Sequence, residues 1–275
     1  MSVNRTGAAE ATPFSVLIDR LSARDKGEKI VIPPDWMQGR SAFGGLQVAL
    51  LLRAMRLHES TLPALRTVQV AFVAPVPQRV PIDLEIELLR RGRNAVQVEG
   101  RLRHSGQTLC LAVAVFGAGR ESTVRKVLPS SPIVADAETG PELPYVPGLS
   151  PDFMQHFSMR WLLGGWPFST SQTDSSIIAL AHRDDAALTE SHVVALADAV
   201  PPAALSRLAR PAPGSSLTWT LEFLVDSLAG SPGDGWQMDL EMTAAGEGYA
   251  QQSGILRSPA GDAVALSRQT TVLFA

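Results

Sequence analysis

One acidic side chain stands alone in an apolar stretch of the sequence. Asp198 is the single charged residue among residues 193–200, where its neighbours are valine, alanine and leucine. A buried carboxylate is unfavourable unless it is paired, so it is seldom found there without a partner. Burial also raises the pKa of a carboxyl group toward the range that suits a general base. Asp198 is therefore a candidate base, and a capping contact ahead of Pro201 is the alternative.

Two hydroxyl groups and one amide are candidates to work with this base. Ser216 and Thr218 alternate with apolar residues in a predicted strand, so we expect them to share one face. An ordinary solvent-facing side is the simpler interpretation of that face. Gln269 lies in the last predicted strand. Because a core strand carries an amide only where it finds a hydrogen-bond partner, a reacting group and a backbone tie are both open interpretations.

Two glycines open a long apolar segment. Gly44 and Gly45 precede residues 46–55, which are apolar at all but two positions and rich in good helix formers. Free N–H groups and the positive end of the helix dipole lie at such a start. The glycines therefore either permit close packing or stabilise a developing oxyanion, and in a duplicated fold this end would face Asp198.

Other chemistries find little support in the sequence. The histidines have no metal-ligand spacing, so no metal site is predicted. They are His58, His104, His156, His182 and His192. No Gly-x-Ser-x-Gly elbow, phosphate loop or dinucleotide motif is present, and no cofactor is predicted.

Composition narrows the class of protein. The 275 residues are 45% hydrophobic and 19% charged with a net charge of −3, which argues against a general nucleic-acid binder. Residues 1–120 carry 16 Lys or Arg against 10 Asp or Glu, whereas residues 121–275 carry 8 against 17. Two solvated faces of opposite sign are the simpler interpretation, and a basic rim for a phosphate-bearing ligand is the alternative. The arginines of that rim would be Arg90, Arg91, Arg93, Arg101 and Arg103.

The single cysteine, Cys110, lies in an apolar strand-like stretch and is interpreted as a buried small hydrophobe, so no intrachain disulfide can form. Residues 1–12 lack a basic segment followed by an apolar core, so no secretory signal is predicted. Arg53 and Arg56 interrupt the long apolar run, which is too short to span a membrane. We predict a cytoplasmic protein without membrane insertion.

The elements that must position these residues follow one plan twice. A helix from residue 43 precedes predicted strands at residues 67–73, 81–89, 95–104 and 108–116. Predicted strands at residues 159–163 and 175–182 are followed by a second helix, residues 191–200, and by strands at 216–223, 236–243, 249–257 and 264–274. The spacing from Gly92 to Gly100 equals that from Gly246 to Gly254. The pattern predicts two copies of one helix-plus-sheet unit, packed edge to edge.

Between the copies the sequence changes character. Residues 117–151 contain six scattered prolines and show no hydrophobic period, which is typical of a linker. We therefore divide the chain into an N-terminal repeat (residues 1–120), a Pro-rich linker (residues 121–152) and a C-terminal repeat (residues 153–275).

A long apolar helix with Gly-Gly at its start, wrapped by antiparallel sheet and duplicated in one chain, resembles the TesB-like acyl-CoA thioesterases of the double hot-dog superfamily. The resemblance covers roughly residues 12–120 and 153–275. The resemblance rests on these segments: Phe43-Gly44-Gly45, Phe72-x-x-Pro75, residues 89–93, Ala197-Asp198-Ala199, residues 216–223 and Ser267-Arg268-Gln269. It implies an α+β double hot-dog fold, in which two tandem helix-wrapped sheets form one continuous sheet.

The resemblance also implies roles for individual residues. The catalytic set of the family is an aspartate on the second helix, a Thr or Ser on the next strand and a glutamine on the last strand. These positions fall on Asp198, Ser216 and Gln269, which would hold and activate a water that attacks a thioester carbonyl. Relatives have an Asp two residues after the hydroxyl, where this chain has Thr218, so Ser216 and Thr218 both stay open as its source. Gly44, Gly45 and Thr218 are the expected substrate-binding residues.

The resulting hypothesis is an acyl-CoA thioesterase of fatty acid metabolism that releases a free acid and CoA. One alternative is a non-catalytic double hot-dog protein that binds acyl-CoA or lipid. Another is a hot-dog enoyl-CoA hydratase, although the Asp–His pair of such hydratases is not found near Asp198. Because hot-dog sheets tend to associate, we expect a homo-oligomer.

Overall fold

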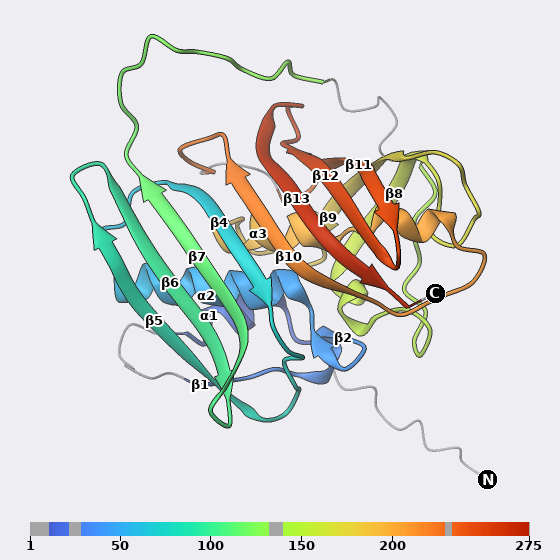
Figure 1. Ribbon diagram of the computed structural model, residues 1–275, viewed down its shortest axis with the longest axis horizontal. Helices are drawn as coiled ribbons and strands as arrows, with labels where there is room; N and C mark the ends of the chain where they lie inside the picture. Colours follow the sequence, from blue (N-terminus) through green and yellow to red (C-terminus); the bar gives the residue numbers. More distant parts are fainter. Residues whose placement is uncertain (1–10, 22–28, 132–139, 229–232, 275) are drawn as a thin grey trace.

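The computed structural model describes residues 11–21, 29–131, 140–228 and 233–274 (Figure 1). One antiparallel sheet dominates these residues, with 11 strands in the order β1-β5-β6-β7-β4-β10-β13-β12-β11-β9-β8. Its strands are β1 (Lys29–Val31), β4 (Leu65–Phe72), β5 (Pro81–Arg91), β6 (Ala95–His104), β7 (Gln107–Gly117), β8 (Phe157–Gly164), β9 (Ser175–His182), β10 (Gly214–Phe223), β11 (Trp236–Gly246), β12 (Tyr249–Arg257) and β13 (Ala263–Leu273).

The remaining elements are short apart from two helices. They are α1 (Phe14–Asp19), α2 (Gly44–His58), α3 (Glu190–Ala199), the 3-10 turns η1 (Pro34–Trp36), η2 (Asp152–His156) and η3 (Ala203–Arg207), and the hairpin of β2 (Met37–Gln38) and β3 (Ser41–Ala42). Among the residues that the structure describes, no helix is long and apolar enough to cross a membrane.

The sheet order confirms the predicted repeat. From the middle of the sheet outward, the first copy reads β4-β7-β6-β5-β1 and the second reads β10-β13-β12-β11-β9. The chain order also matches. In the first copy α2 follows β1 and precedes the other four strands, and in the second copy α3 follows β9 and precedes the other four strands. The copies join where β4 pairs with β10, with Val68 opposite Leu221. Each copy thus covers an edge strand of the other.

Helix α2 is the buried centre of the first copy. It lies across one face of strands β5, β6, β7 and β4 (Figure 1), and every residue from Gly44 to Leu52 is buried. A helix that is apolar on all sides is stable only when protein surrounds it. The sheet covers one side of α2, and α3 packs against another.

The two helices run antiparallel and very close together. A Cβ atom on Gly45 would lie 3.1 Å from the Cα of Ala195, so the helices approach where a side chain is missing. Nearer the other end, the hydroxyl of Ser191 donates to the carbonyl of Ala49 at 3.3 Å. The start of α2 therefore lies beside the end of α3, and the end of α2 lies beside the start of α3.

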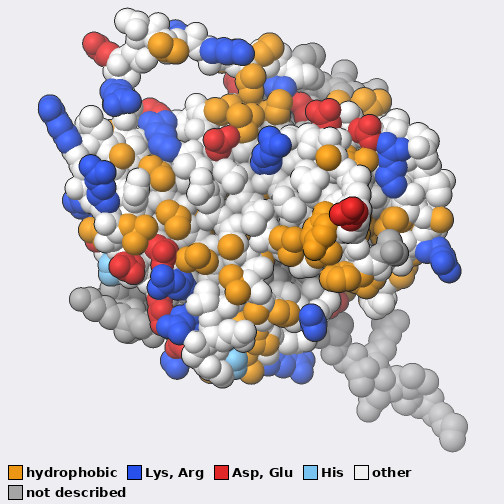
Figure 2. Space-filling model, viewed as in Figure 1, with side chains coloured by type: hydrophobic (Ala, Val, Ile, Leu, Met, Phe, Trp, Pro, Cys, Tyr) orange, Lys and Arg blue, Asp and Glu red, His pale blue; other side chains and the backbone are white. Residues whose placement is uncertain are grey.

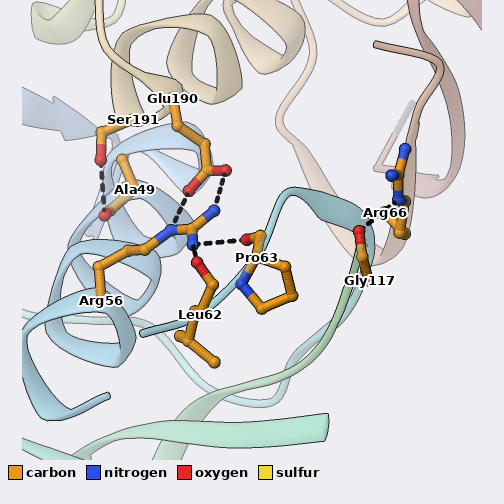
Figure 3. A network of polar contacts seen from close by, with 8 residues as sticks. All are labelled: Ala49, Arg56, Leu62, Pro63, Arg66, Gly117, Glu190 and Ser191. Carbon is orange, nitrogen blue, oxygen red and sulfur yellow. Dashed lines mark hydrogen bonds and ion pairs between the residues drawn. The ribbon is translucent and has the colours of Figure 1, made fainter. Parts of the chain in front are cut away.

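An ion pair closes the end where α2 finishes and α3 begins (Figure 3). The guanidinium of Arg56 donates to both carboxylate oxygens of Glu190, at 3.1 and 2.8 Å, and to the carbonyls of Leu62 and Pro63, each at 2.6 Å. Each charge also suits its place, because an anion is favourable at a helix N-terminus and a cation at a C-terminus.

Part of the predicted linker belongs to the packed structure. The N–H of Leu143 donates to the carbonyl of Met159, and the N–H of Trp161 donates to the carbonyl of Pro141. Residues 140–143 therefore run along the edge strand β8, whereas residues 118–131 leave β7 and cross the top of the view in Figure 1. Prolines break the hydrophobic period here without preventing these edge contacts.

Replacing Arg56 tests the closed end of the helix pair. Arg56→Met leaves a half-buried Glu190 and two carbonyls without their donor. We expect the free energy of unfolding to fall by about 1–3 kcal/mol, measured by chemical denaturation. Arg103→Met is the control, because it also removes an ion pair, with Glu85, and a hydrogen bond to a carbonyl, that of Gly106, but both contacts are exposed. An exposed ion pair is worth less than about 1 kcal/mol. Equal losses in the two variants would contradict a special role for Arg56.

Candidate active site

The structure brings the three predicted catalytic side chains together. The amide nitrogen of Gln269 donates to Asp198 Oδ1 at 2.8 Å and to Ser216 Oγ at 2.9 Å. Asp198 lies in the last turn of α3, Ser216 near the start of β10, and Gln269 in the adjacent strand β13. One amide therefore links the carboxylate to the hydroxyl group.

A bulge in β10 determines which of the two hydroxyl groups lies beside Gln269. The register with β13 shifts between Ser216 and Thr218, so that Ser216 lies opposite Thr271 and Thr218 opposite Thr270. The expectation that Ser216 and Thr218 share a face is therefore wrong, because the extra residue, Leu217, breaks the alternation. Ser216 lies on the helix side, whereas Thr218 is exposed and stands outside the cavity described below.

The start of α2 supports the carboxylate from behind. The backbone N–H of Gly45 donates to Asp198, and a Cβ on Gly44 would lie 2.7 Å from Asp198 Oδ2. The predicted meeting of this helix start with Asp198 is thus found. The N–H of Gly45 is engaged by the carboxylate, however, and neither glycine lines the cavity. Both glycines therefore lie against Asp198, and their predicted contact with a substrate stays a prediction.

Burial changes the acidity of this carboxylate. It raises the pKa of Asp198 from an ordinary value of 3.8 to about 7, against the lowering effect of the hydrogen bonds from Gln269 and Gly45. The residue keeps some accessible surface, but the surrounding protein replaces most of the water that would stabilise its charge. A carboxyl group with this pKa can take up a proton near neutral pH.

The only cysteine of the sequence, Cys110, is close enough for the charge of Asp198 to affect its pKa. Burial raises the pKa of Cys110 to about 12, and the charge of Asp198 adds to the effect. The thiol therefore stays protonated, as expected of the buried small hydrophobe that the sequence predicts.

Asp198, Ser216 and Gln269 lie in the wall of a cavity of about 460 Å³. Most of the other lining residues are apolar. They come from η2 and the segment before it, the β8–β9 loop, the end of α3, η3 and the approach to β10. They include Leu143, Val146, Leu149, Phe153, Met154, Phe168, Val200, Leu205 and Pro213. A polar group in an apolar pocket of this size is the usual form of a small-molecule site.

A second glutamine, which the sequence analysis did not identify, completes the hydrogen-bond chain. Gln252 lies opposite Gln269 in the sheet and donates from Nε2 to Gln269 Oε1 at 2.8 Å. Its own Oε1 accepts from the backbone N–H of Ala203 at 2.9 Å. The available signal was alternation in the strand, since Gln252 shares the inward face with Ala250 and Gly254.

Comparisons with known proteins bear on this arrangement. The sequence matches the family descriptions "Acyl-CoA thioesterase N-terminal domain" over residues 32–117 and "Acyl-CoA thioesterase C-terminal domain" over residues 135–273. The chain belongs to the acyl-CoA thioesterase family. The predicted resemblance is thereby confirmed, although a search of curated proteins gave no significant match.

Solved structures confirm the α+β double hot-dog fold. A conserved protein of unknown function with a hot-dog fold from Alicyclobacillus acidocaldarius is 25% identical, with a TM-score of 0.77 over 90% of this chain and 92% of its own. The tesB protein of Mycobacterium avium subsp. paratuberculosis is 17% identical, with a TM-score of 0.67 over 90% and 96% of the two chains. Acyl-CoA thioesterase II TesB2 of Mycobacterium marinum is 16% identical, with a TM-score of 0.67 over 89% and 91%.

Four polar residues, Asp198, Ser216, Gln252 and Gln269, form the polar set of this thioesterase-family chain, and this set occurs at one end of the helix pair only. Ala114 stands in β7 where Gln269 stands in β13, each eight residues after a turn glycine, and its partner in β6 is Val98. The register and the helix contacts supply the other equivalences. The counterparts of Asp198, Ser216, Gln252 and Gln269 are Leu52, Leu65, Val98 and Ala114. Apolar side chains thus replace all four.

The predicted basic rim lies elsewhere. Arg91, Arg101 and Arg103 form ion pairs with glutamates of the first repeat, and no arginine of the predicted set lines the cavity. Blue and red side chains are mixed on that side of the molecule, at the left in Figure 2. The simpler interpretation, a solvated strand edge, fits these pairs. Among the described residues, no group of three or more His, Cys, Asp or Glu could hold a metal ion.

Adding a methyl group at residue 44 tests how closely α2 approaches Asp198. In Gly44→Ala the new Cβ would lie 2.7 Å from Asp198 Oδ2 and 3.1 Å from the Phe72 ring. We expect the free energy of unfolding to fall by about 1–3 kcal/mol, as in other overpacked cores. Gly246→Ala is the matched control, since no atom lies within 4 Å of its Cβ. Identical denaturation curves for the Gly44 variant and the wild type would contradict the close approach.

The raised pKa of Asp198 predicts how stability depends on pH. The folded state holds the proton of the Asp198 carboxyl group more tightly than the unfolded state does. The stabilisation that this protonation contributes is therefore fully present below about pH 4 and is lost as the pH rises through about 7. Between these values the stability of the wild type relative to Asp198→Asn should fall by about 1.4 kcal/mol per pH unit. Urea titrations of both proteins across this range measure the difference. A difference that is independent of pH would contradict the raised pKa.

Proposed function

We propose that the protein hydrolyses acyl-CoA thioesters and that Asp198 activates the attacking water. One observation carries the proposal: Asp198 is held by Gln269 in the wall of an apolar cavity, with the Ser216 hydroxyl beside it. The apolar lining suits an acyl chain, and the polar group suits its thioester. Membership of the acyl-CoA thioesterase family supports the same reaction class.

In the proposed reaction, Asp198 accepts a proton from a water while the water oxygen bonds to the thioester carbonyl carbon. The tetrahedral intermediate then collapses, the carbon–sulfur bond breaks, and the proton held by Asp198 passes to the leaving sulfur. The products are a carboxylic acid and CoA. The chemistry needs no metal or redox cofactor, because a general base with a pKa near 7 suffices to generate the nucleophile.

The hydroxyl of Ser216 has a distinct part in this proposal. Its oxygen accepts a hydrogen bond from Gln269, so its own proton remains to donate. We assign that proton to the water or to the carbonyl oxygen as negative charge develops there. The N–H of Gly45 is directed at Asp198, and the amide of Gln269 donates to Asp198 and Ser216, so the Ser216 hydroxyl is the donor of the set that is still available.

The test is release of free CoA thiol from a panel of acyl-CoA chain lengths by the purified protein. We expect Asp198→Asn to lower kcat by about 100-fold or more, the scale of a lost general base. Ser216→Ala should lower kcat as well, whereas Thr218→Ala on the exposed face should retain it. For the wild type, kcat/KM should rise with pH through about 7 as Asp198 ionises.

Three outcomes would contradict the proposal. Full activity in Asp198→Asn would remove this residue from the mechanism. Tight binding of acyl-CoA without turnover at any chain length would favour the non-catalytic binding protein instead. Hydration of an enoyl-CoA would assign the same cavity to the lyase alternative.

A further inference from the structure

The orientation of the Gln269 amide determines whether its NH₂ group or its carbonyl oxygen faces Asp198 and Ser216. Its NH₂ group faces both Asp198 and Ser216. If the amide were reversed, its carbonyl oxygen would face the carboxylate at hydrogen-bond distance, and two acceptors would repel. A protonated Asp198 would tolerate either direction, so the carboxylate alone does not fix the amide throughout a reaction that protonates it.

Gln252 supplies a fixed direction from the opposite side. It donates to the carbonyl oxygen of Gln269 at 2.8 Å, which only the observed orientation of Gln269 can accept. Gln252 is in turn oriented by the backbone N–H of Ala203, which donates to its carbonyl oxygen at 2.9 Å. A peptide N–H cannot change from donor to acceptor. The chain of hydrogen bonds therefore begins at a group that cannot be reversed.

Both amides are buried, so water does not readily substitute for these contacts. Gln252 is 8% exposed and Gln269 is 6% exposed. Buried amides adopt the orientation that satisfies all of their donors and acceptors. Gln252 neither contacts Asp198 nor lines the cavity, but its anchor, Ala203, directly follows Pro201 and Pro202 in the cavity wall.

We infer that Gln252 is a positioning residue for the hydrolysis proposed above, on which this inference rests. It keeps the NH₂ group of Gln269 directed at Asp198 and Ser216 before and after the proton transfer. The apolar counterpart in the first repeat, Val98, stands where no amide needs such a partner.

Two variants test this role. Gln252→Met preserves length but removes the donor to Gln269, and we expect kcat to fall by about 10- to 100-fold while KM changes little. Gln252→Glu keeps the acceptor for Ala203 but, once ionised, has no proton for Gln269, whose amide then reverses toward the new carboxylate. The Gln252→Glu variant should therefore lose activity at high pH. For this variant, kcat at about pH 9 divided by kcat at about pH 6 should be at least about 10-fold smaller than the same ratio for the wild type.

The neighbouring glutamine provides matched controls. Gln251 lies on the same strand and faces the other side of the sheet, so Gln251→Met and Gln251→Glu should keep the wild-type kcat and pH profile. Folding of every variant is checked by its thermal transition. Folded Gln252 variants with wild-type kcat and pH profile would overturn the inference, as would a change confined to KM and stability. Absence of thioester cleavage by the wild type would instead overturn the proposed function.

Discussion

The contact between the Asp198 carboxylate and the start of α2 constrains the rest of the structure. It requires a glycine at residue 44, because a Cβ there would lie 2.7 Å from the carboxylate. It requires the antiparallel crossing of α2 and α3, which brings the end of one helix beside the start of the other. The positive end of the α2 dipole then faces a negative charge, a favourable arrangement that neither repeat forms alone.

Duplication in one chain allows the two ends of the helix pair to differ. The repeats share strand order and a helix in the same place, so a symmetric assembly of identical copies would carry the same residues at both ends. Here one end carries the polar set at a cavity, and the other is closed by Arg56 and Glu190 beside apolar counterparts such as Leu52. A smaller pocket of about 160 Å³ borders Leu65 and Glu190 at that second end. The ion pair there can serve stability, and that frees the first end to hold a carboxylate in an unfavourable setting.

The order of elements could be predicted from hydrophobic period and glycine spacing, since both follow directly from which side chains face the core. Asp198 could be found because a lone charge in an apolar helix is rare. The side on which Ser216 lies could not be predicted, because the bulge at Leu217 depends on how β10 pairs with the distant strand β13. Gln252 was missed for a related reason: a glutamine beside Gln251 looks like a solvent-facing strand, and its partner is 17 residues away.

The depth of burial explains why the pKa of Asp198 differs from that of other partly buried aspartates. Burial raises the pKa of Asp184 too, but donors from Ser15 and Ala186 outweigh it, and the pKa falls below its usual value. Asp35 behaves likewise with His156 and Thr12. Asp198 is more fully desolvated, and one of its two donors, Gln269, is shared with Ser216. A further donor would stabilise the charge and weaken the base, so deep burial together with few donors keeps this carboxylate basic enough to accept a proton from water.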